Sequence, residues 1–305
     1  GHDQKFQLLC KACHNSKTRS ESHDDNPLIS HFSTATWDAY VKADRPKPLV
    51  YKARERTNDN PPVCLDVIRC RRNALYFNAH KVPVFSVMDS VEVSNGANLQ
   101  TADVYFVTKK YKAFELQLGY TGEGWYARVA AEWWLHTGVI TPQDISHVLR
   151  ATAHLPHDVF RTPLDEMRTA WQDAHMDKQA VNSLIGLWFL DEAVSYRHFS
   201  SSDVRDAPAG DWRQSVFVHP GGQEYDWVKV ESLVNTTSYR PILDLVLSTE
   251  CVRVGQAIYA LKRQGLGRHI LEYKTDSILV TPPARRKRKV EALWGLTYDD
   301  LSGLR

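Results

Sequence analysis

The sequence predicts an α+β fold in which antiparallel strands are backed by helices. Strand-like and helix-like segments are mixed along the chain, whereas a doubly wound parallel sheet requires strict alternation. Apolar residues make up 43% of the 305 residues, and nine of these are Trp. A chain of this length and composition can bury a large core and form two subdomains. The net charge of +2 does not by itself indicate nucleic-acid binding.

The cysteine content and the hydrophobic pattern indicate a reducing, intracellular compartment. Only two of the five Cys lie close together, which is not typical of a disulfide framework. No apolar stretch approaches the roughly 20 residues of a membrane span, and the N-terminus lacks a signal-peptide core, so we expect no membrane partner. Nucleus, organelle and virus or plasmid all stay open. The absence of an initiator Met indicates a piece of a larger protein.

Strands and helices alternate irregularly in the first half of the chain. Apolar or alternating runs predict a buried strand at 62–68, an extended segment at 82–85, and two paired strands at 103–109 and 112–119. Helical patterning predicts helices at 69–78 and 127–135, the second of which places Trp133 and Trp134 in the core.

The second half is predicted to be more helical. Thr141 and Pro142 predict a helix start, as N-cap and first-turn residues. Helices are then expected at 163–193, the longest, and between Pro241 and Gly265. The intervening 200–222 predict a loop or hairpin, and strands are expected at 269–273 and 278–281.

Two aspartates occupy positions where a carboxylate suits metal chemistry. Asp66 lies inside the apolar run Val63-Cys-Leu-Asp-Val-Ile, where burial is costly unless the carboxylate is paired or binds a metal. Asp276 lies at the turn between the last two strands, which projects it beyond the sheet. The alternatives are that Asp66 caps the following helix and that Asp276 is an ordinary turn residue.

The segment Lys178-Gln-Ala-Val-Asn-Ser-Leu-Ile-Gly186 places Lys178, Asn182 and Gly186 on one stripe of a helix. This stripe suits a triphosphate, because it offers a charge, an amide and a position of close approach. A glycine inside a helix costs about 1 kcal/mol relative to alanine. The alternative is a solvated stripe with a helix–helix contact at the glycine.

These three segments together resemble the conserved motifs of family B DNA polymerases, of the protein-primed, organellar or viral type. The Asp66 strand with Val82-Pro83 resembles motif A. Lys178-x-x-x-Asn-Ser-x-x-Gly resembles motif B, and Tyr273-Lys-Thr-Asp-Ser-Ile resembles motif C. Tyr239-Arg-Pro-Ile and the helix after it also follow the family layout. The resemblance covers roughly residues 60 to 282.

The resemblance implies a polymerase palm with inserted helical fingers, and a two-metal site for nucleotidyl transfer. Asp66 and Asp276 would hold two Mg²⁺, with the Val67 carbonyl as a further ligand. The residues that would contact the incoming dNTP are Lys178, Asn182, Gly186, Arg168 and Arg71. Thr275 and Ser277 would shape the turn that presents Asp276, beside the DNA. Primer-template DNA and dNTPs are the implied partners.

The chain departs from the family pattern at several positions. Lys274 stands where the first aspartate of motif C is expected. Arg69, Cys70 and Arg71 replace the Ser-Leu-Tyr of motif A, so the tyrosine that discriminates against ribose is absent or is replaced by Tyr76. Ile185 replaces a motif B tyrosine. The resemblance implies an upstream exonuclease and a downstream thumb in the full-length protein.

The N-terminal Cys10-Lys-Ala-Cys13-His14, with Lys17-Thr18, resembles part of a zinc-bearing HNH nuclease element. Cys10 and Cys13 could share one Zn²⁺, but a closed site needs four ligands. A truncated structural remnant and a c-type haem attachment are the alternatives.

A dense basic run spans residues 285–289. Its arginines, Arg285, Arg286 and Arg288, are candidate contacts to DNA phosphates. A solvated charged loop or a localisation patch is the alternative.

The predicted organisation is an HNH-like remnant and linker at 1–26, palm at 27–141, fingers at 142–195, and palm with the start of a thumb at 196–305. The predicted function is template-directed DNA polymerase. The alternatives are a polymerase-derived DNA-binding module that has lost catalysis, which Lys274 and Arg71 favour, and an HNH-type endonuclease fragment.

Overall fold

The structure is a computed structural model, and it describes residues 26–53, 55, 58–110, 118–171, 174–189, 193–210, 212–233, 237–287 and 290. Helices and sheets are mixed, and every strand pair among these residues is antiparallel. The α+β class predicted from the sequence is therefore confirmed at this level. None of the helices in these ranges is long and apolar enough to cross a bilayer.

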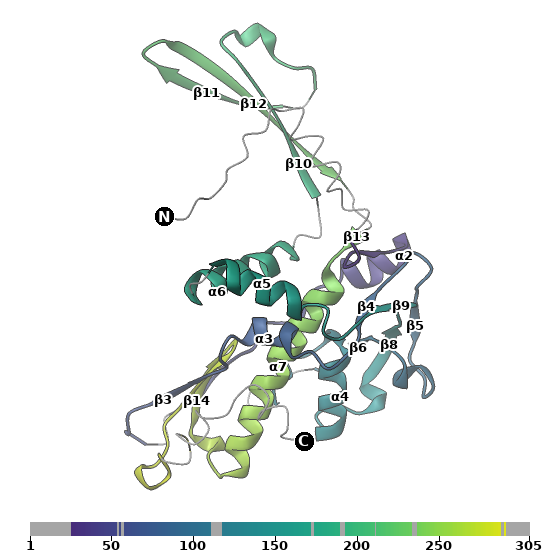
Figure 1. Cartoon of the computed structure of the whole chain (residues 1–305), viewed down its shortest axis with the longest axis vertical. Helices are drawn as coiled ribbons and strands as arrows, with labels where there is room; N and C mark the ends of the chain where they lie inside the picture. The colour runs from purple at the N-terminus through teal and green to yellow at the C-terminus, as the bar shows by residue number, and fades with distance from the viewer. Residues whose placement is uncertain are drawn as a thin grey trace.

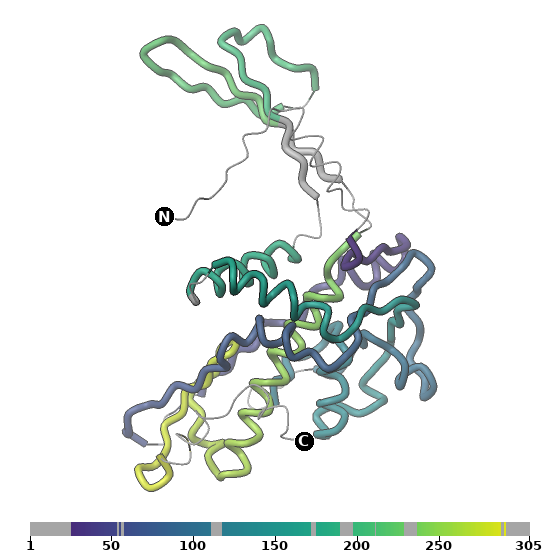
Figure 2. The backbone as a smooth tube through the Cα atoms, in the orientation of Figure 1, coloured from purple at the N-terminus to yellow at the C-terminus, as the bar shows by residue number. Residues whose placement is uncertain are grey.

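One four-stranded sheet combines two strands from the first quarter of the chain with two strands from its last part. Its order is β2 (Val50–Lys52), β14 (Ile270–Lys274), β15 (Ser277–Val280) and β3 (Val63–Asp66). Figure 2 shows the early β3 beside the late hairpin β14–β15. The strand expected at 62–68 forms, but the prediction that it is buried was wrong. It lies at the sheet edge, where only Leu65 of its four residues is buried.

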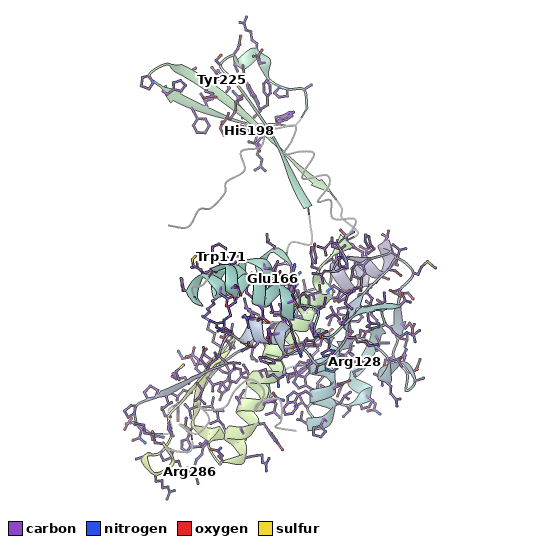
Figure 3. All side chains as sticks on the ribbon, in the orientation of Figure 1. Arg128, Glu166, Trp171, His198, Tyr225 and Arg286 are labelled. Atoms are coloured by element: carbon purple, nitrogen blue, oxygen red, sulfur yellow. The ribbon has the colours of Figure 1, made fainter. Side chains whose placement is uncertain are left out.

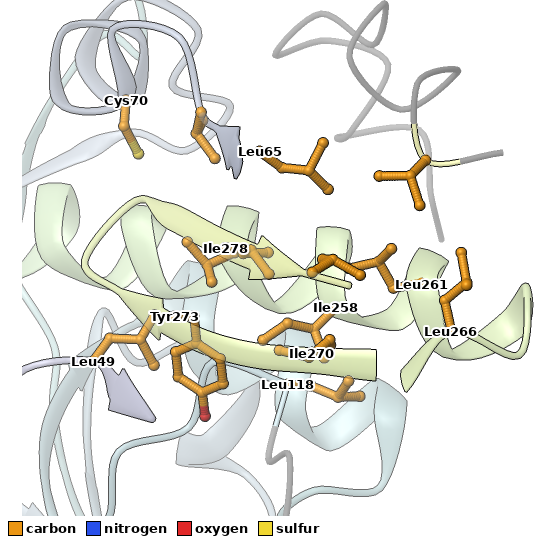
Figure 4. Packing of buried hydrophobic residues seen from close by; sticks show 14 residues of the cluster. Leu49, Leu65, Cys70, Leu118, Ile258, Leu261, Leu266, Ile270, Tyr273 and Ile278 are labelled. Carbon is orange, nitrogen blue, oxygen red and sulfur yellow. The ribbon is translucent and has the colours of Figure 1, made fainter. Parts of the chain in front are cut away.

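Helix α7 (Arg240–Arg263) packs against this sheet and is the longest helix of the described residues. Pro241 lies in its first turn, and the chain leaves it at Gly265, whose φ of 70° suits glycine. Both predicted ends are confirmed. Ile258 and Leu261 of the helix share a buried cluster with Ile270 and Ile278 of the hairpin (Figure 4). This packing fixes the hairpin turn relative to the helix.

The helix expected at 163–193 is instead two helices. These are α5 (Arg161–Trp171) and α6 (Ala174–Leu187), which pack against each other and against α3 (Cys70–Tyr76). Figure 1 shows them side by side above α3. Apolar periodicity runs through both, so the pattern did not reveal that α5 ends at Trp171 and α6 begins at Ala174.

A second four-stranded sheet has the order β5 (Val91–Val93), β8 (Ile145–Leu149), β6 (Val104–Val107), β7 (Gly124–Ala127) and is covered by α4 (Arg128–Thr137). β6 pairs with β7 on one side and with β8 on the other, and residues 112–117 of its predicted partner strand lie outside the described residues. The helix predicted at Thr141 was also wrong beyond one 3-10 turn, Pro142–Asp144, which leads directly into β8. Trp133 and Trp134 are core residues, as expected.

The remaining elements are smaller. Two-stranded sheets pair β1 (Ser30–His31) with β13 (Thr237–Ser238), and β4 (Val82–Val84) with β9 (Ala153–Leu155). A three-stranded sheet has the order β10 (Ala193–Ser201), β12 (Gly222–Leu233), β11 (Arg213–His219) and stands apart from the other elements in Figure 1. The hairpin within 200–222 is thus part of a larger sheet. The short helices are α2 (Thr34–Thr36), a π-helical turn at Trp37–Val41, and 3-10 turns at Asn98–Gln100, Val204–Asp206, Gly267–His269 and Ala284–Arg286.

Candidate active site

Asp66 and Asp276 lie together at one end of the first sheet. Asp66 ends β3, and its cross-strand partner is Ser277, the residue that follows Asp276. The N–H of Val67 donates to the carbonyl of Asp276 at 3.0 Å, which extends the pairing past the last residue of β3. Asp66 does not cap α3, because the N-cap of that helix is Arg69. The strand pairing therefore brings two carboxylates that are 210 positions apart in sequence to the same end of the sheet.

The turn that carries Asp276 is shaped by its neighbours. Thr275 has a left-handed φ of 54°, which is unusual for a residue with a branched side chain. Its hydroxyl donates to the Lys274 carbonyl at 2.7 Å and contacts Oδ1 of Asp276 at 3.1 Å. The Ser277 hydroxyl donates to the same Lys274 carbonyl at 3.1 Å. In the structure both hydroxyls bond within the turn.

The two carboxylates open into a cavity of about 220 Å³. It is lined from four sides: by β3 and the β14–β15 turn, by the first turn of α3, by α6 and by α7. Its residues are Asp66, Arg69, Cys70, Arg71, Arg72, Lys178, Val181, Asn182, Glu250, Thr275 and Asp276. The three predicted segments therefore meet at one cavity.

Burial and two neighbouring charges change the pKa of Asp66. Burial raises the pKa of Asp66, the nearby charge of Asp276 raises it further, and Lys178 lowers it. The negative charge of Asp276 beside Asp66 creates a site that attracts cations. Lys178 is exposed on α6 and lines the cavity, and its charge acts on Asp66. Lys274 is exposed at the end of β14 and does not line the cavity.

Glu250 is a site residue that the sequence reasoning missed. It lies on α7, it is 6% exposed, and Arg71 Nε donates to its Oε2 at 3.1 Å. Burial raises the pKa of Glu250, Arg71 lowers it, and the charge of Asp276 raises it. The only sequence signal was an acidic residue inside an otherwise buried helical run.

Arg69, the N-cap of α3, and Arg72 within that helix bind carboxylates on the neighbouring helices. Arg69 donates to Oδ2 of Asp177 at 3.0 Å, and Arg72 Nε lies 3.7 Å from the same oxygen. Asp177 is 1% exposed and precedes Lys178 on α6. Arg69 also has a left-handed φ of 48°. These contacts tie α6 to residues of the cavity wall, and the left-handed backbone at Arg69 and Thr275 also lies in that wall.

The other dNTP candidates divide into two groups. Asn182 lines the cavity with Lys178, while Gly186 and Arg168 are exposed and do not line it. No atom lies within 4 Å of a Cβ built at Gly186, so the helix–helix contact considered for this glycine is absent among the described residues. The Val67 carbonyl accepts from the N–H of Cys70 at 3.2 Å, which leaves a second lone pair for a metal.

The candidate DNA and zinc residues lie elsewhere or outside the described ranges. Arg286 Nη1 donates to the carbonyls of Gln264 at 3.1 Å and Gly265 at 2.9 Å, so this side chain caps the end of α7. Arg285 is exposed. Arg288, Cys10 and Cys13 lie outside the described residues. The cysteines within the described residues are Cys64, Cys70 and Cys251.

The donor set fits Mg²⁺ better than a metal that requires a closed protein cage. No group of three His, Cys, Asp or Glu side chains suited to a metal is found in the described part of the chain. Mg²⁺ in nucleotidyl-transfer sites needs only one or two carboxylates, with substrate phosphates and water completing its shell. Asp66 and Asp276 supply that number, and their mutual repulsion is what a cation would relieve.

The chain is similar in fold to solved structures of phi29 DNA polymerase. The complex of that polymerase with primer-template DNA and incoming nucleotide substrates aligns at 13% identity and a TM-score of 0.51, over 90% of this chain and 49% of the polymerase. Its orthorhombic crystal form aligns at 12% identity and a TM-score of 0.49, over 88% and 48%. No family model matches the chain, and no curated protein matches it.

The similarity shows a fold like that of a DNA polymerase and no more. The chain spans about half the length of the polymerase it aligns with. The activity of the whole polymerase therefore enters only as a proposal.

Proposed function

We propose that this chain is the palm and fingers of a family B-like DNA polymerase, which adds dNTPs to a primer 3′ end by two-metal nucleotidyl transfer. The observation that carries the proposal is the meeting of Asp66 and Asp276 at one end of the sheet, with Lys178 in the same cavity. The fold similarity to phi29 DNA polymerase supports it independently.

In this proposal the sheet β2–β14–β15–β3 with α7 is the palm, and the α5–α6 pair forms the fingers. The fingers then begin near Arg161 rather than at 142, because β8 and β9 occupy much of 142–155. The N-terminal element at 1–26, the possible Zn²⁺ at Cys10 and Cys13, the exonuclease and thumb segments and the intracellular location stay predictions.

Each residue would have a defined task. Asp66 and Asp276, with the Val67 carbonyl, would hold Mg²⁺, which when bound activates the primer hydroxyl and stabilises the departing pyrophosphate. Lys178 would bind the triphosphate by charge, and Asn182 one turn later would donate or accept hydrogen bonds. Thr275 and Ser277 would hold Asp276 in place, since both bond within its turn.

A second candidate is a DNA-binding module without catalysis. Lys274 favours it, because the turn of the hairpin carries one acid, Asp276, and β14 adds a cation at the same end. Both functions predict binding to primer-template DNA, but only the polymerase extends it.

Primer extension with Mg²⁺ and dNTPs separates the two. The polymerase proposal predicts extension by the wild-type chain and loss of extension in Asp276→Ala, with DNA binding retained in both. The exposed Glu166 on α5 (Figure 3) offers a control, and Glu166→Gln should extend normally. DNA binding without any extension favours the second candidate, and unchanged extension in Asp276→Ala removes Asp276 from its role.

A further inference from the structure

The cavity has two chemically different walls besides the aspartate pair. Lys178 lies on α6, and its charge acts on Asp66. Glu250 lies on α7 and pairs with Arg71 of α3 at 3.1 Å. Helix α3 contacts both α6 and α7, so Lys178 and the Arg71–Glu250 pair stand on different walls of the cavity.

These two walls suit different parts of a bound nucleotide. If metal ions at the aspartates hold the α-phosphate, the remaining phosphates extend toward the single amine on the Lys178 side. The sugar attached to the α-phosphate then lies toward the Arg71–Glu250 side. That side offers hydrogen-bonding groups rather than a hydrophobic wall.

Glu250 is equipped to accept a hydrogen bond from a sugar hydroxyl. Arg71 uses its Nε to bond Oε2, so it holds the carboxylate in one orientation. Within the described residues no hydrogen bond engages Oε1, and this oxygen is not among the atoms sealed from solvent without a partner. A carboxylate oxygen accepts up to two bonds, and the guanidinium keeps further N–H donors.

Nothing in the described lining would exclude a hydroxyl by bulk. None of the eleven lining residues is aromatic. Tyr76, the nearest tyrosine along α3, does not line the cavity. Its hydroxyl donates to Oδ2 of Asp165 at 3.0 Å, and its ring carries Arg72 at 5.0 Å. Tyr76 therefore does not stand in for the tyrosine missing from motif A.

We propose that the Arg71–Glu250 pair binds a ribose 2′-hydroxyl, so that the site accepts ribonucleotides as well as deoxyribonucleotides. The inference rests on the proposed function and names its substrate class. The hydroxyl could belong to the incoming nucleotide or to the terminal residue of the primer. A site whose buried polar groups bond a hydroxyl favours the ligand that has it, because the analogue leaves those groups unpaired.

The test compares sugars in single-nucleotide extension. A DNA primer is offered a matched dNTP or rNTP, and a primer ending in one ribonucleotide is offered the dNTP. We expect kcat/KM for rNTP within about tenfold of that for dNTP, and a further loss of about tenfold for rNTP alone in Glu250→Gln, the size of one charge-assisted hydrogen bond. An effect confined to the ribo-terminated primer assigns the hydroxyl to the primer terminus. Rejection of both ribo substrates by about a thousandfold overturns the inference.

Two controls separate sugar recognition from a structural role. Glu166→Gln changes an exposed acid of the same type and should leave the rNTP/dNTP ratio unaltered. Arg71→Lys keeps the charge and removes the fixed fork, so it should lower the ratio in the same direction as Glu250→Gln. Equal loss of rNTP and dNTP use in Glu250→Gln, with normal thermal unfolding, would also overturn the inference.

Equilibrium binding keeps this inference distinct from the proposed function. Binding of ATP and dATP is measured by calorimetry with Ca²⁺, without primer. A chain that extends no primer refutes the polymerase, while tighter ATP binding that is lost in Glu250→Gln still supports the sugar contact. Equal binding of ATP and dATP, unaltered in Glu250→Gln, refutes the contact whether or not extension occurs.

Discussion

Asp177 is the residue whose removal should most clearly separate a buried ion pair from an exposed one. Asp177 and Asp165 both contact Arg72, but Asp177 is 1% exposed and Asp165 is 52% exposed. Asp177 also accepts from Arg69 at 3.0 Å. The Asp177→Ala variant leaves Arg72, whose side chain is only 9% exposed, without its buried partner.

The two variants should differ several-fold in cost. Removing one partner of a buried pair costs about 3 to 5 kcal/mol, because the remaining charge stays desolvated. Arg69 is 27% exposed and recovers part of its hydration, so we expect a value near the lower limit, about 3 kcal/mol, for Asp177→Ala. Asp165→Ala removes a solvated contact and should cost less than about 1 kcal/mol.

Urea unfolding followed by circular dichroism measures both costs, and hydrogen exchange locates them. Exchange in α6 should accelerate in Asp177→Ala, because the contacts of Asp177 tie this helix to α3. If Asp177→Ala is no more destabilising than Asp165→Ala, the assignment of α6 as a helix held by buried charges is wrong.

Three further predictions concern the helix behind the site, the basic run and the acid pair. Gly255→Ala should destabilise the protein by about 3 kcal/mol in urea unfolding, because a Cβ there would lie 2.1 Å from the carbonyl oxygen of Leu118. A cost below about 1 kcal/mol would contradict this close contact. Arg286→Ala should lower stability by about 1 kcal/mol through its lost helix cap, whereas Arg285→Ala should leave stability unchanged and reduce the salt dependence of DNA binding by about one charge; the reverse pattern would contradict these roles. Burial and the charge of Asp276 raise the pKa of Asp66, and Lys178 lowers it. On acidification, Mg²⁺ binding should therefore be lost at a pH above the pKa of an ordinary aspartate, and Lys178→Gln should move this loss to higher pH. Calorimetric Mg²⁺ titrations from about pH 4 to 7 that show no difference between Lys178→Gln and the wild type would exclude the coupling.

The sequence was informative where a single residue type dictates local geometry. Pro241 and Gly265 marked the two ends of α7, since proline suits a first turn and glycine adopts a left-handed φ. The stripe of Lys178, Asn182 and Gly186 also lies on one exposed face of α6, as its spacing predicts.

Tertiary contacts determine the features that no local sequence pattern predicts. Asp144 closes a capping box with Thr141, which looks like a helix start, but the chain enters β8 because β6 offers it an open edge. The role of Glu250 depends on Arg71, which lies 179 positions away, and no local pattern links the two. Partners of buried charges are therefore the part of the site that only the fold reveals.

Metal-directed cleavage offers the most direct test of the acid pair. Fe²⁺ bound in place of Mg²⁺, with ascorbate and peroxide, cuts the backbone beside its ligands. The account predicts cuts near both Asp66 and Asp276, protected by excess Mg²⁺ and abolished at both places by Asp276→Asn alone. Cuts at only one of the two strands, or cuts that survive Asp276→Asn, would contradict a shared metal site.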